Sequence, residues 1–287
     1  MWGANFHLLT ILLSSSHFIE AAFWRYLFAV ITLFAITIKN LPNWRLFIIN
    51  SKGIILTGVF GLLGFNLLLF WGLNYTTPIN ASLILSLSPI TTIAMSRAFF
   101  KSKITSWQLT GTLLGIYGVV FLISKGQLAG LSWNNISKGD FLMLLAMVLA
   151  SCYHIGIKKF MVNISNKQFT LLTHLVCFAG ILPLLPVLSI PASLNHPLDF
   201  WMAALLFGVL GTALTFFLWN KGVEAIGPDK ASIYINIVPI ATASIAIVLG
   251  EQISRFHYVS GLFILTGLVV FRGWKIEQIL PSKCCAR

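Results

Sequence analysis

Charged residues are scarce in this chain of 287 residues: they make up 9% of it, and only seven are acidic. Soluble globular domains carry about 25% charged residues, so the composition excludes one. Hydrophobic residues account for 57%, and apolar runs recur as far as the C-terminal region, which excludes a soluble secreted protein with a single leader segment. The composition predicts an integral membrane protein whose main surroundings are the lipid bilayer.

Several chemical motifs are also missing. The chain holds no G-x-x-x-x-G-K-[S/T] sequence and therefore no ATPase of its own, and it holds no H-E-x-x-H zinc motif. Its four cysteines show no metal-binding spacing. We expect no cofactor, no metal and no catalytic residue. The net charge is +12, but the basic residues lie between apolar runs and form no contiguous face, so nucleic acid is not an expected partner.

Ten apolar segments predict ten transmembrane helices. A spanning helix needs about 17–25 residues, and every segment except the short first one approaches or exceeds that length. The expected fold is an all-α integral membrane protein. The segments cover residues 2–13, 19–38, 54–74, 79–100, 107–123, 140–157, 169–190, 200–219, 231–249 and 256–274.

The basic residues orient these helices. If the N-terminus is cytoplasmic, fifteen of the nineteen basic residues fall in inner loops or the C-terminal tail, three (Lys125, Lys138 and Arg255) fall in outer loops, and Arg25 lies within a span. The positive-inside rule then places both termini in the cytoplasm. We expect a multi-pass protein of the cell (inner) membrane.

The two halves of the chain resemble each other. FGLLG at 60–64 recurs as FGVLG at 207–211, and from Pro78 to Gly111 matched residues recur at a constant offset of 150. Five helices per half make the repeats inverted in the membrane, which is a common transporter plan. The expected divisions are a first repeat (1–124), an outer linker (125–138), a second repeat (139–274) and a cytoplasmic tail (275–287).

Five features of the chain form a recognisable set: W-G-x-N-F in the first segment, the arginine in the second, G-F-N-L-L-L-F-W-G-L-N-Y, A-S-L-I-L-S-L-S-P and F-L-W-N-K-G-V-E-A-I-G-P-D-K-A-S. Together they resemble the EamA-type branch of the drug/metabolite transporter superfamily. The resemblance covers nearly the whole chain. It implies ten helices, a central cavity formed mainly by helices 1, 3, 4, 6, 8 and 9, and transport of small metabolites, often efflux of amino acids or related compounds.

Two features depart from that family pattern. The family usually has a turn or two of apolar helix before W-G, so we expect a natural start upstream of Met1; the alternative is a first helix that enters the membrane partway. The acid of the family's G-E pair is present as Glu251, but the first repeat has Lys101-Ser102-Lys103 there. We interpret Glu251 as a helix cap or local ion-pair partner.

Small and polar residues repeat in helices 4 and 9. The spacing of 4 and then 3 places each trio on one helical face, and each proline frees a backbone carbonyl one turn earlier. Such faces either pack helices closely or line a cavity. We predict cavity residues at the serines and the asparagine, and structural or gating roles for the prolines: Ser82, Ser86 and Pro89, and Ser232, Asn236 and Pro239.

Other cavity candidates come from the remaining wall helices. Buried amides, histidines and tyrosines in a membrane need partners and therefore face the bundle interior. The alternatives are ordinary hydrogen bonding within the bundle, and an interfacial aromatic belt for the two tryptophans. The candidates are Asn5, Asn66, Trp71, Tyr153, His154 and Trp219.

Arg25 lies within the second segment. Charges there are costly and usually have a purpose. It can read a substrate, reach back to the outer surface, or hold helices together. We favour an interhelical structural or gating contact, with a carbonyl or an acid of a neighbouring helix as partner.

The predicted function is secondary transport of neutral, zwitterionic or aromatic metabolites by alternating access. A channel-like facilitator or, less favoured, a polytopic membrane enzyme are the alternatives. No acid lies deep in a span, so exchange, facilitated diffusion and a histidine proton path (through His154, His7 or His174) stay open. The expected partner is a small-molecule substrate, and both a monomer and a homodimer stay open.

Overall fold

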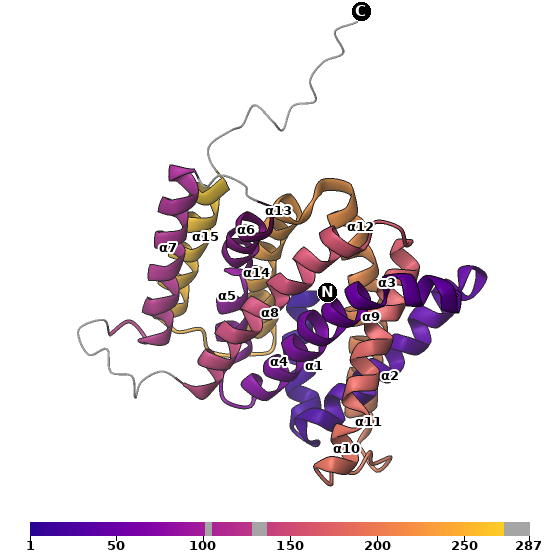
Figure 1. The fold of residues 1–287 in the computed structure, drawn as a ribbon. Helices are drawn as coiled ribbons and strands as arrows, with labels where there is room; N and C mark the ends of the chain where they lie inside the picture. Colours follow the sequence, from indigo (N-terminus) through magenta and orange to yellow (C-terminus); the bar gives the residue numbers. More distant parts are fainter. Residues whose placement is uncertain (101–104, 128–136, 273–287) are drawn as a thin grey trace, which may run out of the picture.

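The computed structural model describes residues 1–100, 105–127 and 137–272, apart from the side chains of Trp44, Phe100, Asp229, Lys230, Ile233, Asn236 and Arg272. Every regular element in this part is helical (Figure 1). Among the described residues, seven helices are by length and composition apolar enough to cross a membrane, and three shorter apolar helices accompany them. The chain is therefore a helical protein with several membrane spans, as predicted.

The described part of the first half contains nine helical elements, some of which join end to end. One long continuous helix is made of α3, η2 and α4. The elements are α1 (Trp2–Leu13), α2 (Phe18–Thr37), the 3-10 turn η1 (Ile38–Asn40), α3 (Trp44–Leu56), the π-helix η2 (Thr57–Gly64), α4 (Phe65–Leu73), α5 (Pro78–Leu85), α6 (Ser88–Phe100) and α7 (Ser106–Ile123), with α8 (Lys138–Phe160) opening the second half.

The second half repeats this order. Here α11, η5 and α12 join into the long helix. After α8 come α9 (Asn166–Ile181), α10 (Leu184–Val187), α11 (Leu198–Leu206), the π-helix η5 (Phe207–Leu214), α12 (Thr215–Ile226), α13 (Pro228–Ala231), the 3-10 helix η6 (Ser232–Asn236), α14 (Ile237–Val248) and α15 (Arg255–Arg272).

The helix expected at residues 54–74 begins earlier, at Trp44, and this correction has a local cause. Asn43 caps the helix by accepting a hydrogen bond from the Leu46 amide at 2.7 Å. Polar side chains in the added turns bond back to the helix itself: the Asn50 amide donates to the Leu46 carbonyl and the Ser51 hydroxyl to the Ile48 carbonyl. Polar residues therefore continue the helix although they break the apolar run.

The helices expected at 79–100 and 231–249 are interrupted, which a continuous apolar run does not reveal. Residues 86 and 87 form a turn between α5 and α6, and η6 precedes α14 as a narrower 3-10 segment. Each interruption comes just before a proline, Pro89 or Pro239, which lacks the amide that would continue the hydrogen-bond ladder. The two prolines lie 150 residues apart.

The π-helices η2 and η5 also lie 150 residues apart and face close neighbours. A Cβ added to Gly61 of η2 would lie 2.8 Å from the Cα of Tyr153 in α8. A Cβ added to Gly211 of η5 would collide with the Asn5 amide of α1. Glycine is thus required where each wide helix meets the opposite half of the chain.

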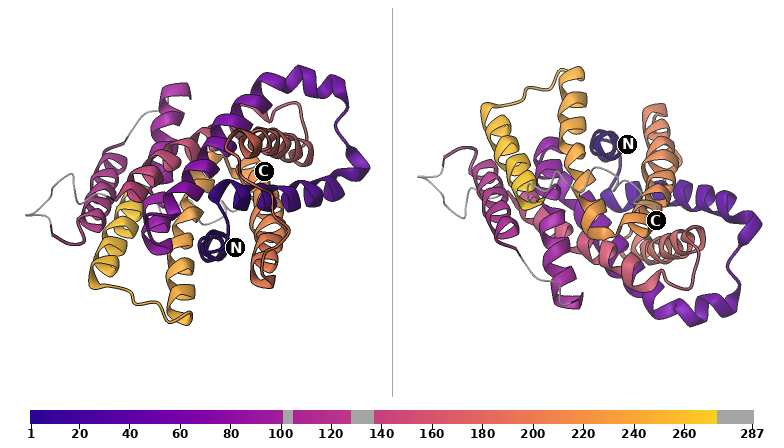
Figure 2. Two further views of the ribbon diagram at one scale, coloured as in Figure 1. Left: turned by 90° about the horizontal axis from the view of Figure 1, so that it is seen from below. Right: turned by 90° about the horizontal axis from the view of Figure 1, so that it is seen from above.

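Two arrangements position the site. Helix α1 stands between α14 and the α11–η5–α12 helix, which Figure 2 shows in both views. Helices α7 and α15 pack side by side along their length at the left of Figure 1, because Gly111 and Gly267 allow their backbones to touch.

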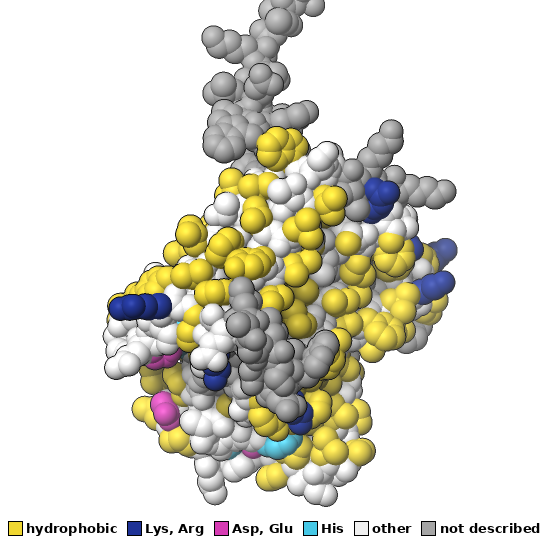
Figure 3. Space-filling view, turned by 90° about the vertical axis from the view of Figure 1, so that its left-hand side faces the viewer, with side chains coloured by type: hydrophobic (Ala, Val, Ile, Leu, Met, Phe, Trp, Pro, Cys, Tyr) yellow, Lys and Arg dark blue, Asp and Glu magenta, His cyan; other side chains and the backbone are white. Residues whose placement is uncertain are grey.

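The outer face of the α7–α15 pair is apolar. Figure 3 shows many hydrophobic side chains spread over this side of the molecule and only a few charged ones. Large apolar residues of α7 and α15 are more than half exposed: Trp107, Leu109, Leu113, Tyr258, Leu262 and Val269. Exposed apolar surface of this extent suits contact with lipid.

Candidate functional site

A cavity lies between the two halves of the chain, and both halves contribute to its wall. The first half contributes α1, α2, η2, α4, α5 and α6, and the second half α8, η5, α12, η6 and α14. Most of the wall is apolar, with aromatic rings of Trp2, Phe6, Phe65, Phe207 and Phe216. Apolar walls with a few polar groups are typical of small-molecule sites. The polar groups here are Asn5, Arg25, Ser88, Tyr153 and His154.

Arg25 lines the cavity and joins three helices. Its Nε donates to Thr212 Oγ1 of η5 at 2.6 Å, and its Nη1 donates to Asn66 Oδ1 of α4 at 2.7 Å. Both partners are anchored in turn, because Asn66 donates to the Leu62 carbonyl and Thr212 to the Phe207 carbonyl. The side chain is 2% exposed, so it does not reach back to the surface. An interhelical contact was predicted, but its partners are an amide and a hydroxyl.

Aromatic rings surround the Arg25 guanidinium. Its Cζ lies 3.9 Å from the ring centre of Phe207 and 5.3 Å from that of Phe70. Such cation–π contacts contribute about 2 kcal/mol when desolvated. They help to hold a buried charge, but they do not neutralise it.

Tyr153 begins a buried chain of hydrogen bonds behind the cavity. Its hydroxyl donates to Asn220 Oδ1 at 3.0 Å, and Asn220 Nδ2 donates to Thr170 Oγ1 at 2.8 Å. Thr170 then donates to the Asn166 carbonyl. The chain links α8, α12 and α9 and fixes the Tyr153 ring edge-on to Phe216. The predicted cavity residue Tyr153 thus lines the wall in a fixed orientation.

His154 lies beside Tyr153 on the cavity wall. Its Nδ1 is 3.2 Å from Thr92 Oγ1 of α6, and Thr92 donates to Ser151 at 3.2 Å. Its ring lies 5.1 Å from that of Trp219. Hydrogen bonding within the bundle, the alternative to a ligand role, therefore occurs at one ring nitrogen.

The two interrupted helices meet the cavity at corresponding positions. Leu85 and Ile235, each four residues before a proline, both line the wall. Proline removes the donor that these carbonyls would meet in a regular helix. Both Pro89 and Pro239 are buried, and the structural role predicted for them remains a prediction.

The remaining predicted residues lie at different places. The Ser82 and Ser86 hydroxyls donate to their own helix, at the Ile79 and Leu83 carbonyls, so the packing alternative describes their contacts. Ser232 is fully buried, and the Asn236 side chain is outside the described part. Asn66 is buried as a partner of Arg25, and Asn5 donates to the Gly211 carbonyl at 2.9 Å.

The two repeat-related tryptophans occupy unequal positions. Trp219 does not line the cavity itself, but its ring lies against Trp2 and His154, which do. Trp71 is 36% exposed; it stacks on Phe18, and Lys138 Nζ lies 4.4 Å from its ring centre. Trp71 therefore lies away from the cavity, in surroundings that fit the belt alternative.

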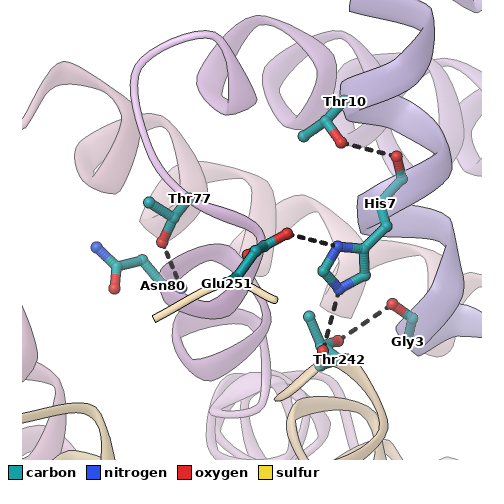
Figure 4. Close-up of polar contacts among 7 residues, drawn as sticks. All are labelled: Gly3, His7, Thr10, Thr77, Asn80, Thr242 and Glu251. Atoms are coloured by element: carbon teal, nitrogen blue, oxygen red, sulfur yellow. Dashed lines mark hydrogen bonds and ion pairs between the residues drawn. The ribbon is translucent and has the colours of Figure 1, made fainter. Parts of the chain in front are cut away.

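A polar contact joins α1 to the end of α14, as Figure 4 shows. His7 Nε2 faces the Thr242 carbonyl at 3.0 Å, and His7 Nδ1 lies 3.3 Å from Glu251 Oε1 without the alignment of a hydrogen bond. A carbonyl only accepts, so Nε2 carries the proton.

Gly250 turns the chain so that Glu251 can face His7. It has φ +78°, its amide donates to the Ile247 carbonyl, and the Glu251 amide donates to the Ala246 carbonyl. These two bonds form a Schellman motif, in which glycine takes the left-handed conformation. The predicted local ion pair of Glu251 is thus a contact with a distant helix.

Several residues around the site escaped sequence reasoning. Asn220 and Thr92 hold Tyr153 and His154, and an amide within the motif F-L-W-N-K was a usable signal for the first. The phenylalanines of the wall carry no signal, since apolar residues abound in every span. Within the described residues, no three His, Cys, Asp or Glu side chains come together as a metal site.

The fold and cavity define a helical multi-span membrane protein with a small-molecule cavity between its halves. The sequence model of the EamA-like transporter family matches residues 1–124 and 137–273. The chain belongs to this family, which confirms the resemblance predicted from its motifs.

Several known proteins are similar to this chain. An uncharacterized transporter of Bacillus subtilis, YyaM, is 28% identical over 78% of this chain and 74% of its own. A probable amino-acid metabolite efflux pump of Salmonella typhimurium is 25% identical over 94% of this chain and 90% of its own length. A probable terminal-alkyne amino-acid exporter of Streptantibioticus cattleyicolor is 22% identical over 80% of this chain and 77% of its own length. One crystal structure shares the fold with a TM-score of 0.69 at 16% identity, and the match covers 94% of this chain and 92% of the chain in that structure.

Proposed function

We propose that the protein is a secondary transporter that exports amino acids or related neutral or zwitterionic metabolites across the cell (inner) membrane. Ten helices in two inverted repeats alternate access to the central cavity. Both termini lie in the cytoplasm, and no covalent chemistry takes place. Transport activity in general follows from the family; the direction, substrate class, helix count and orientation are the proposal.

The cavity between the halves supports this proposal most directly. Seven residues of its wall, from Ala150 to Val238, belong to the second half, and the others belong to the first. A site at the interface of two repeats becomes accessible to each side in turn when one half rocks against the other. The matched pairs of π-helices and interrupted helices, each 150 residues apart, support a repeat relationship between the halves.

The substrate class is supported by the wall and by relatives. Aromatic rings and a few polar groups suit a small molecule with an apolar side chain and one polar end. The Salmonella and Streptantibioticus relatives are both named for amino-acid export. Their names guide the choice of test compounds.

The test is counterflow in proteoliposomes. Purified protein, reconstituted with an unlabelled neutral amino acid inside, should take up the same labelled amino acid transiently above equilibrium. Uptake should saturate with concentration. An Ala150→Trp variant, which fills the cavity, should lose the flux. The matched variant Ala35→Trp, at an exposed position of α2, should keep it.

The outcomes separate the alternatives. Flux that neither saturates nor shows counterflow would indicate a channel. The absence of flux for every amino acid and analogue of a broad panel would overturn the proposal, provided that the protein is folded by its thermal unfolding profile.

A further inference from the structure

Arg25 carries a buried positive charge without an acidic partner. It is 2% exposed, and no carboxylate lies within ion-pair distance of it in the described part of the chain. Glu20, the acid nearest to Arg25 in the sequence, is buried and has other partners: it accepts a hydrogen bond from the Ser193 amide and contacts His196. Buried charges in proteins are normally paired.

The neutral partners of Arg25 orient its guanidinium and leave part of it unused. Thr212 and Asn66 occupy Nε and Nη1. Nη2 makes no hydrogen bond to any residue that the structure describes. Since a guanidinium presents its donors as a rigid planar fork, fixing two nitrogens fixes the third. Arg25 itself lines the cavity, so its charge lies at the cavity wall.

The rest of the wall has no group that would bind an ammonium by charge. Its polar side chains are Asn5, Ser88, Tyr153 and His154, and no Asp or Glu that the structure describes lines it. In this cavity the carboxylate of a zwitterion can therefore meet a full positive charge, whereas its ammonium group can meet only neutral polar groups. The surrounding aromatic rings accept an apolar side chain.

We propose that Arg25 binds a carboxylate in this cavity. The substrates then share a carboxylate next to an apolar or aromatic side chain, and their ammonium group is dispensable. A charge-assisted bond from Nη2 in a mostly apolar cavity is stronger than one between neutral groups. This inference rests on the proposed transporter function, and it names the substrate group that the site recognises.

The first test uses the protein without any substitution. In proteoliposomes, counterflow of labelled L-phenylalanine is measured against two unlabelled competitors that share its side chain. 3-Phenylpropanoate keeps the carboxylate and lacks the amine, whereas phenethylamine keeps the amine and lacks the carboxylate. 3-Phenylpropanoate should compete about as well as phenylalanine, and phenethylamine should be weaker by roughly tenfold or more.

The second test removes the charge. Arg25→Gln keeps a hydrogen-bonding side chain without the charge, and it should abolish the preference for 3-phenylpropanoate over phenethylamine. Arg45→Gln, at an exposed position of α3, is the matched control and should keep that preference. Thermal unfolding shows whether each variant folds. If Arg25→Gln does not fold, Thr212→Val, which releases Nε and frees the guanidinium to turn, should reduce the preference.

The possible failures are distinguishable. Absence of counterflow for phenylalanine and the rest of the amino-acid panel would remove the proposed function. Phenylalanine counterflow that phenethylamine inhibits as strongly as 3-phenylpropanoate would overturn the carboxylate site and leave the transporter standing. The same would follow if a folded Arg25→Gln protein kept the carboxylate preference.

Discussion

The imidazole of His7 and the carboxylate of Glu251 lie 3.3 Å apart, although they come from opposite ends of the chain. Helix α1 is thereby joined to the turn that follows α14. Glu251 is 40% exposed, so water screens the pair and its energy is modest. The pair nevertheless connects the first half of the chain, through His7, to the second half, through Glu251.

The His7–Glu251 contact predicts non-additive substitutions. His7→Ala and Glu251→Ala should each lower the free energy of unfolding, and the double variant should lose less than the sum. The expected coupling is about 0.5 kcal/mol, since one partner is partly exposed. Unfolding in detergent measures it. His7→Ala combined with Glu224→Ala, an exposed acid of α12, should be additive; additivity for Glu251 as well would argue against the contact.

Gly250 should resist substitution although nothing crowds it. An added Cβ would meet no atom within 4 Å, yet its φ of +78° disfavours any other residue. Gly250→Ala should therefore cost about 1 kcal/mol of stability. Gly222→Ala, equally uncrowded but inside α12, should be neutral or stabilising by about 0.5–1 kcal/mol. Equal thermal unfolding of the two variants would contradict a left-handed turn at Gly250.

Gly61 should resist substitution for a different reason. An added Cβ would lie within 3.0 Å of the Tyr153 backbone, which cannot move aside as a flexible side chain can. Gly61→Ala should cost about 1–3 kcal/mol and shift α8 at the cavity wall. Gly261→Ala meets only a Leu83 methyl at 3.8 Å and should be tolerated. The readouts are unfolding temperature and counterflow rate, and a stable, active Gly61→Ala protein would refute the close approach.

Removing the Tyr153 hydroxyl should leave an unpaired buried acceptor. Tyr153→Phe takes the donor away from Asn220 Oδ1. The expected loss of stability is about 1–3 kcal/mol. Tyr234→Phe removes a hydroxyl at a position that is 63% exposed and should be near neutral. A Tyr153→Phe protein as stable as Tyr234→Phe would show that the buried chain contributes little.

Sequence patterns predicted the class of fold well because lipid imposes a simple rule: each span must be apolar and satisfy its own backbone. The same rule gives no information on irregular turns within a span. The break before Pro89 and the π-helices leave no trace in hydropathy, since they alter hydrogen bonding within runs that stay apolar. The added turns of α3 escaped because Asn50 and Ser51 lower the hydropathy while bonding to the helix itself.

Some residues of the candidate site could likewise be predicted from the sequence, and others could not. Asn5, Tyr153 and His154 lie on the cavity wall, as expected for polar groups that must avoid lipid. Spacing could not tell a serine that faces a cavity from one that bonds to its own helix, and Ser82 and Ser86 do the latter. Long-range pairs such as Arg25 with Thr212 need three dimensions, because no periodicity within one helix encodes a partner in another.

The π-helices have a mechanical consequence. A π-helix keeps its backbone hydrogen bonds internal, so a spanning helix can widen locally without exposing amide groups to lipid. Shifting one residue between wide and regular turns rotates everything beyond it by about 100°. In each long helix the π-helix lies where a glycine brings the opposite half of the chain into contact. A one-residue shift there would therefore rotate the rest of the long helix relative to that contact.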